Sequence, residues 1–152
     1  VTNCFMRRLT TETKLIEVVD SLVEQHQNTE KMFSSESFSN GDVRRLSLKV
    51  DIPLLLRIAQ AAFYARFTEK DRPSKFPAGD WLLDRYHGLK LYIKSNLQPI
   101  LQGRHLIELG LKPGPFFGKI LNDAYQKQLD DEFMTLEDAI NWAKQEVEKI
   151  SS

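Results

Sequence analysis

The chain has 152 residues, 41% of them hydrophobic, and its 21 basic and 21 acidic side chains give a formal net charge of zero. That is enough for one substantial core, or two smaller ones, without disulfides or a structural metal. The lone Cys4 excludes an intramolecular disulfide and favours a reducing, cytoplasmic setting. No apolar run approaches the roughly 18 residues of a membrane span, and the first residues lack the apolar core of a signal peptide. We therefore expect neither a membrane partner nor secretion.

Charge is distributed unevenly along the chain. Residues 44–94 carry eleven basic groups against five acidic ones, whereas residues 129–152 carry seven acids and two lysines. A basic middle and an acidic end can orient a polyanion along one face, although helices with ordinary solvated charges give the same pattern. Because the chain begins with Val1, directly in a charged amphipathic pattern, we expect a piece of a longer polypeptide.

Apolar residues recur every three or four positions from about residue 11 to residue 27, the spacing of one buried helical stripe. Thr10 is expected to cap this helix, and the stripe to consist of Leu15, Val18, Val19, Leu22 and Val23. Residues 28–39 are Ser-rich and aperiodic, which predicts a loop and a first domain boundary.

Two helices are predicted next. Asn40 is expected to cap a short helix with Arg44 and Arg45 on its outer side. Asp51 is expected to cap the helix that follows, with Pro53 in the first turn, where its missing N–H costs nothing. The core-facing residues of the two helices are Val43, Leu46, Val50, Leu55, Leu56, Ile58, Ala59, Ala62 and Phe63.

Residues 68–80 contain two prolines and a run of charges, which predicts a linker or a long turn. Asp80 is expected to begin a further helix, in which Trp81 and Arg85 combine apolar and cationic groups. Gly88 is expected to end or bend that helix.

The chain contains no recognisable catalytic or metal-binding motif. His26, His87 and His105 have no carboxylate or second His at the spacing of metal ligands. There is no Gly-rich phosphate loop and no Gly-x-Ser-x-Gly elbow. The Gly-Ser dipeptide and Asp-x-Asp pair used in two-metal nucleotidyl transfer are also missing. The sequence therefore predicts no catalytic residue, no metal site and no cofactor in this chain.

Glycine and proline punctuate the stretch GRHLIELGLKPGPFFGKIL, which begins at Gly103. Gly110 falls where a left-handed residue would end a short helix, and Pro115 suits the first position of the next one. We therefore predict a helical hairpin joined by a tight turn.

The start of the second hairpin helix is a natural anion site. Its first N–H groups, from Pro115 to Phe117, point outward beside Lys112 and Lys119, and Gly114 allows a phosphate to approach the backbone closely. The alternative is a hairpin whose glycines only permit tight packing.

A last helix is predicted after Thr135, which forms a capping box with Asp138. Its buried stripe is expected to consist of Ala139, Trp142, Ala143 and Val147. All these elements together predict an all-α protein, a multi-helix body and tail with a helical hairpin near the C-terminus.

Residues 97–144 also carry a family resemblance. They contain Gly-Arg-His-Leu, then Leu-Gly-Leu-Lys-Pro-Gly-Pro, then a helix ending in Gln-Leu-Asp-Asp-Glu, then a helix with Trp142. This order resembles the C-terminal tail of bacterial tRNA nucleotidyltransferases, the CCA-adding enzymes, and of their poly(A) polymerase relatives. His105 replaces the usual Asp of that pattern, and Asp131 the usual Gly.

The resemblance implies three regions. Residues 1–39 would be the end of an HD-like helical region, residues 40–94 a basic helical body and residues 95–152 a helical tail domain. His26 falls where HD-like domains often have a His, but the His-Asp pair is absent, so phosphohydrolase activity is not implied.

The resemblance also implies that the body and tail grip the phosphates of tRNA. A separate N-terminal head of the parent chain, using Mg²⁺ with ATP and CTP, would add nucleotides to the 3′ end. The expected RNA contacts are Arg44, Arg45, Arg104, Lys112, Gly114 and Lys119. The alternative is a non-enzymatic helical interaction module whose basic middle pairs with an acidic partner or with the acidic end of another copy.

Overall fold

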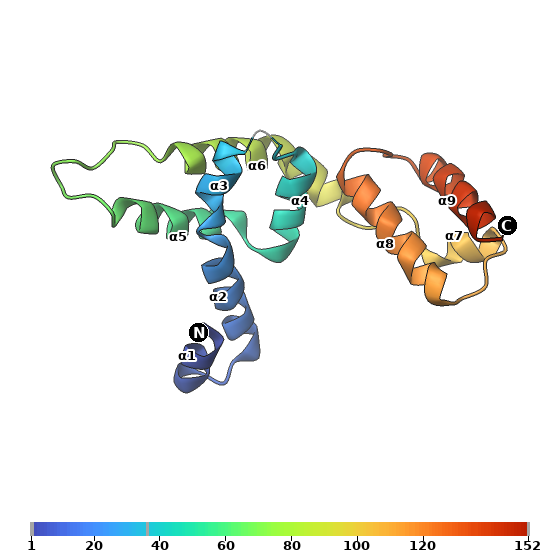
Figure 1. Cartoon of the computed structure of the whole chain (residues 1–152), viewed down its shortest axis with the longest axis horizontal. Coiled ribbons are helices and arrows are strands. Elements are labelled where there is room, and N and C mark those ends of the chain that lie inside the picture. Colours follow the sequence, from blue (N-terminus) through green and yellow to red (C-terminus); the bar gives the residue numbers. More distant parts are fainter. Residues whose placement is uncertain (1, 36, 152) are drawn as a thin grey trace. The chain divides into compact units, whose positions relative to one another are not determined.

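The structure is a computed structural model that describes residues 2–35 and 37–151, the side chains of residues 90–96, 150 and 151 excepted. Within that part of the chain every regular element is an α-helix, which confirms the predicted all-α fold (Figure 1). The helices are α1 (Thr2–Leu9), α2 (Thr13–Gln25), α3 (Asn28–Ser34), α4 (Asn40–Lys49), α5 (Ile52–Tyr64), α6 (Pro77–Asn96), α7 (Gly103–Glu108), α8 (Pro115–Leu129) and α9 (Leu136–Ser151).

The chain forms two compact units. Unit 1 comprises Val1–Ser39 and Val43–Lys90, and unit 2 comprises Asn40–Asp42 and Leu91–Ser152. Each unit has a hydrophobic core of its own.

The main core of unit 1 is built by α2, α4, α5 and α6. Its buried members are Leu22, Val43, Leu46, Val50, Ile52, Leu55, Leu56 and Leu82. Asp51 caps α5 as predicted, because its Oδ1 accepts the Leu54 N–H at 2.8 Å, and Pro53 lies in the first turn. Asn40, predicted as the cap of the preceding helix, is instead the first residue of α4.

The prediction that Arg44 lies on the outer side of α4 is wrong. Its side chain is only 2% exposed, whereas Arg45 is half-buried. The buried face of α4 is wider than its apolar stripe and includes Gly41. Arg44 lies next to the apolar stripe of α4, so its side chain is buried when the stripe packs into the core.

The first helices differ from the prediction in their bounds. The helix expected from residue 11 begins at Thr13, and an unpredicted α1 precedes it. Glu12 rather than Thr10 occupies the N-cap of α2, and Thr10 Oγ1 instead accepts the Glu12 N–H at 3.1 Å. A hydroxyl satisfied inside a turn is no longer available to cap a helix.

The buried stripe of α2 is also narrower than predicted. Ile16 and Leu22 are buried, whereas Leu15, Val18 and Val23 are exposed by 42%, 49% and 39%. Helical periodicity identified this element correctly, but the packing partner decides which side of a broad apolar face is covered.

Residues 28–34, predicted as a loop, fold as the helix α3. Its polar sequence has no helical stripe, and tertiary contacts hold it. Met32 packs against the main core, and the rings of Phe33 and Trp81 meet edge to face with centroids 5.8 Å apart.

The helix expected to begin at Asp80 begins at Pro77, which is suited to a first helical position. It continues past Gly88, so of the two predicted alternatives, an end or a bend at this glycine, the end is wrong. Lys90 and Lys94, two members of the basic block, lie outside the described side chains.

In unit 2, α8 contacts both α7 and α9. The buried core residues are Leu101, Leu106, Ile120, Ala124, Phe133, Ala139 and Ala143. At the start of α9 the Asp138 N–H donates to Thr135 Oγ1 at 3.2 Å, which confirms the predicted N-cap. Ala139 and Ala143 are fully buried beneath half-buried Trp142, as the stripe predicted.

Candidate nucleic-acid interface

The turn between α7 and α8 has the backbone that its glycines and prolines predicted. Gly110 has φ of 86°, in the left-handed region. The Leu111 N–H donates to Leu106 O at 3.0 Å and the Gly110 N–H to Ile107 O at 2.9 Å. These two bonds form a Schellman motif, which satisfies the last carbonyl groups of α7 and stops the helix.

Pro115 is the first residue of α8, also as predicted, and Gly114 is its N-cap. The Phe117 N–H donates to Gly114 O at 3.0 Å, so it is not one of the outward donors that the sequence predicted. Pro115 has no N–H. Among the described residues, the Phe116 N–H has no backbone acceptor.

Gly114 and Gly103 have different local surroundings. A Cβ at Gly103 would lie 3.0 Å from Phe117 Cε1, so close packing of α7 on α8 accounts for that glycine. A Cβ at Gly114 would meet nothing closer than Lys112 O at 3.8 Å. Gly114 is exposed, and packing does not require a glycine there. A ligand can therefore approach its backbone closely from solvent.

The hairpin also presents exposed cations. Lys112 lies in the turn and Lys119 in the second turn of α8, and neither forms an ion pair with a described residue. Lys119 lines a small pocket of about 100 Å³ together with two acidic side chains, Asp123 and Glu146. The local field is therefore positive on the turn side and mixed on the α9 side.

Arg104 is exposed on α7, next to the buried ring of His105. The Gln102 N–H donates to His105 Nδ1 at 3.1 Å, and Arg104 Nε lies 3.2 Å from His105 Nε2. The structure thus brings Arg104, Lys112, Gly114 and Lys119 onto one hairpin of unit 2.

The remaining predicted contacts lie on α4. Arg45 is half-buried, and the buried Arg44 offers no surface for a phosphate, so Arg44 is removed from the candidate interface. Both arginines make interactions within the protein.

Two residues of α8 tie the hairpin to residues 97–100 by hydrogen bonds that the sequence did not predict. Gln128 is 1% exposed, accepts the Ile100 N–H at 2.9 Å and donates through Nε2 to Gln98 O at 3.0 Å. The Tyr125 hydroxyl donates to Leu97 O at 2.8 Å, and burial raises the pKa of this phenol. The sequence offered one indication of this role, because Gln128 is a polar residue on the apolar face of α8.

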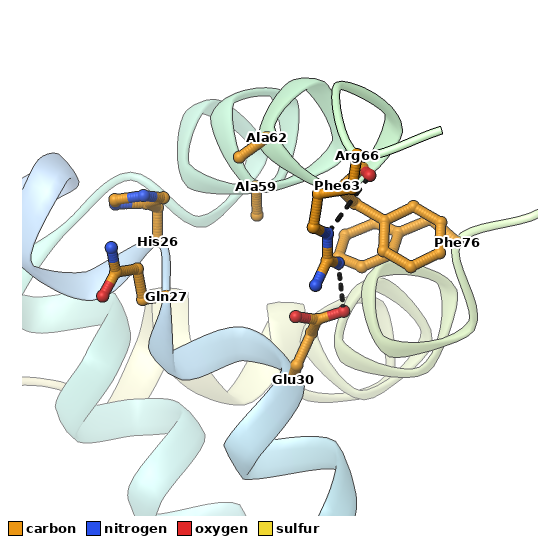
Figure 2. A pocket seen from close by; sticks show the side chains of 8 residues that line it. All are labelled: His26, Gln27, Glu30, Ala59, Ala62, Phe63, Arg66 and Phe76. Atoms are coloured by element: carbon orange, nitrogen blue, oxygen red, sulfur yellow. Dashed lines mark hydrogen bonds and ion pairs between the residues drawn. The ribbon is translucent and has the colours of Figure 1, made fainter. Parts of the chain in front are cut away.

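Unit 1 contains a pocket that the sequence did not reveal. It has a volume of about 320 Å³ and lies between α3 and α5 (Figure 2). Its lining residues are His26, Gln27, Glu30, Ala59, Ala62, Phe63, Arg66 and Phe76. They come from the end of the predicted first helix, from a segment predicted as loop, from a core helix and from a predicted linker, so no local pattern joins them.

These features define an all-α protein with an exposed basic hairpin in one unit and an aromatic pocket in the other. No family model, curated protein or solved structure matches the chain, so membership of the nucleotidyltransferase family stays a prediction. Over the described residues, no group of three or more His, Cys, Asp and Glu side chains is placed to hold a metal ion. None of the helices, over the same residues, is both long and apolar enough to cross a membrane.

Proposed function

We propose that this chain binds tRNA or another structured RNA through its phosphate backbone, with the α7–α8 hairpin as the main contact. It would be the RNA-gripping C-terminal region of a cytoplasmic nucleotidyltransferase of the CCA-adding or poly(A) polymerase type. The catalytic head, with Mg²⁺ and its nucleotides, would be another domain of the parent chain. Nothing in this proposal assigns catalysis to the 152 residues themselves.

One observation supports the proposal most directly. Lys112 and Lys119 are exposed, form no ion pair with described residues, and flank a helix start whose Gly114 is not required for packing. A backbone N–H at a helix N-terminus, here that of Phe116, together with flanking cations provides the usual elements of a phosphate contact. Arg104 on α7 would extend the contact to a further phosphate, and Arg45 of unit 1 would contact phosphates independently of the hairpin.

Charge reversal at the hairpin tests the proposal. In the Lys112→Glu, Lys119→Glu double variant we expect tRNA affinity to fall at least tenfold at 50 mM salt. The dependence of log K on log salt should become shallower by about one unit for each phosphate that the variant no longer binds. The measurement is a binding titration at several salt concentrations, with circular dichroism to verify folding.

The matched control is the Arg8→Glu, Lys14→Glu variant. It changes net charge by the same amount, at exposed positions of α1 and α2 that have no ion pair among the described residues. It should retain most of the affinity. If both variants lose the same amount of affinity, the loss reflects net charge and not the hairpin. If the affinity of the original protein does not change with salt concentration, phosphate binding is refuted.

One observation favours the interaction-module alternative. On α1 and α2, Phe5 and Leu9 are 56% and 67% exposed, and Leu15 and Val18 are also exposed. Exposed apolar side chains of this size on adjacent helices are a common feature of protein-protein contacts. A stable oligomer in light scattering, together with no affinity for RNA, would support that function instead.

A further inference from the structure

The pocket in unit 1 owes its space to small side chains on α5. Ala59 and Ala62 face it, and a larger residue at either position would occupy it (Figure 2). Ala59 is only 4% exposed, whereas Ala62 is exposed to solvent. The pocket of about 320 Å³ is therefore open on the Ala62 side and can admit a ring of the size of a nucleobase.

One wall of the pocket is aromatic and firmly held. The rings of Phe63 and Phe76 are stacked with centroids 4.7 Å apart and planes 31° from parallel. Phe76 is 4% exposed and belongs to a small core with Ala59 and Ala78. A planar ligand can stack on such a wall without ordering it first, which lowers the entropic cost of binding.

The polar edge beside this wall consists of Glu30 and Arg66. Arg66 Nη2 donates to Glu30 Oε1 at 2.6 Å, Arg66 Nε donates to Phe63 O at 3.3 Å, and the guanidinium lies 4.9 Å from the Phe63 ring centroid. The hydrogen bond to Glu30 raises the pKa of Arg66 above its ordinary value, so this group stays charged. These interactions together fix a side chain that is otherwise half exposed.

This ion pair still has bonding capacity. Among the described residues, no hydrogen bond uses Glu30 Oε2 or Arg66 Nη1. Figure 2 shows the second Glu30 oxygen directed toward the side of the pocket where His26 lies. An acceptor and a donor therefore lie next to each other at the edge of an aromatic wall.

His26 lies on the side opposite the ion pair (Figure 2). Its Nδ1 is 2.5 Å from Val23 O, and a carbonyl oxygen only accepts, so Nδ1 carries the proton. In the neutral ring Nε2 is then an acceptor. The pocket thus offers polar groups on two opposite sides and apolar groups between them.

From this arrangement we propose that the pocket binds an unpaired nucleobase of single-stranded RNA, a proposal that rests on the RNA-binding function above. The base would stack on Phe63. Its Watson–Crick edge would meet Glu30 and Arg66, because adenine and cytosine each present an amino donor beside a ring-nitrogen acceptor. Stacking on aromatic side chains with hydrogen bonds at the base edge is the general way in which proteins hold unstacked bases.

The experiment uses the full chain and a five-nucleotide RNA, four uridines with a central 2-aminopurine, titrated by fluorescence. We expect quenching of 2-aminopurine on binding. Ala62→Met should weaken binding by about fivefold or more, which is the lower end of what one stacked base contributes. The matched control is Ala61→Met, the neighbouring exposed residue of α5 that does not line the pocket. Methionine is a good helix former, so both variants should fold.

A second probe separates base recognition from backbone attraction. The same pentamer with an abasic centre should bind the original protein about fivefold more weakly, and Ala62→Met should not weaken it further. Equal affinities of Ala62→Met and Ala61→Met, or of the two RNA probes, would overturn the proposal, as would absence of quenching.

The two proposals fail in different ways. If the chain binds tRNA in a salt-dependent manner but shows no base-dependent binding of the pentamer, the pocket proposal is wrong and the hairpin proposal stands. If the pentamer binds through its base but tRNA binding does not depend on the hairpin lysines, the pocket is upheld and the hairpin function is overturned.

Discussion

Replacing Gln128 by Met should destabilise unit 2 by about 2 kcal/mol. The two side chains have similar length and volume, so the change removes the polar groups of a residue that is 1% exposed without opening a cavity. The variant would lack the tie between α8 and the segment that leads into α7. The Ile100 N–H would lose its acceptor, Gln128 Oε1, which lies 2.9 Å away. Gln98 O would lose its donor, Gln128 Nε2, which lies 3.0 Å away.

The magnitude follows from the surroundings of the two backbone groups. A hydrogen bond removed from a folded protein costs about 1 kcal/mol, and a buried group left without a partner costs about 1–3 kcal/mol. Gln98 is exposed, so its carbonyl can bond to water, whereas Ile100 is half-buried. One full penalty at Ile100 and a small one at Gln98, partly offset by the more apolar side chain, give about 2 kcal/mol.

Urea unfolding followed by tryptophan fluorescence measures this change. Trp81 belongs to unit 1 and Trp142 to unit 2, so a Trp81→Phe background makes the signal report on unit 2. The same Gln-to-Met change at Gln145, an exposed residue of α9, is the control and should stay within about 0.5 kcal/mol. A destabilisation below about 0.5 kcal/mol for Gln128→Met would refute the view that this amide ties the hairpin to the preceding segment.

Three further changes test local features of unit 2. Burial raises the pKa of Tyr125 above 10.0, so the folded state keeps the phenol proton to a higher pH than the unfolded state does. The free energy of unfolding therefore falls as pH rises from about 10 through the folded pKa. Urea titrations should show the stability advantage of the original protein over Tyr125→Phe shrinking across that pH window. Asp131 has φ of 62°, so Asp131→Gly should be about 1 kcal/mol more stable than Asp131→Ala, and equal melting temperatures would contradict this. Gly110→Ala should cost about 1–2 kcal/mol from backbone strain alone, since a Cβ there meets no atom within 4 Å, and a calorimetric change under about 0.5 kcal/mol would contradict it.

The elements that the sequence predicted well have their determinants close together in the chain. The Asp51 cap, the left-handed Gly110 and the first-position Pro115 each act within four residues. Such signals remain valid whatever packs against the helix. The α7–α8 hairpin was therefore predicted almost residue by residue.

The elements that were mispredicted depend on partners far along the chain. Residues 28–34 fold as a helix because Met32 and Phe33 find apolar surface on other helices, and a polar heptapeptide gives no sign of this. Arg44 is buried for a related reason, since which face of α4 is covered depends on its neighbours. Long-range packing overrides local propensity in both cases.

The hairpin and the pocket of unit 1 also differ in how far apart in the sequence their residues lie. The cations of the hairpin lie within sixteen residues of one another, from Arg104 to Lys119, so the sequence could place them on one feature. The pocket joins Glu30 to Arg66 across a separation of 36 residues. A pairing of that kind becomes visible only once α3 and α5 are packed together.

His105 bears on the proposed interface through its contact with Arg104. The Gln102 N–H donates to His105 Nδ1 at 3.1 Å, and Arg104 Nε donates to His105 Nε2 at 3.2 Å. A neutral imidazole accepts through one nitrogen only, so these two donors compete for the ring. An Asp at this position would accept from both groups and neutralise the arginine. With His105, Arg104 keeps a positive charge that a phosphate can neutralise, and in a binding titration His105→Asp should therefore weaken tRNA binding.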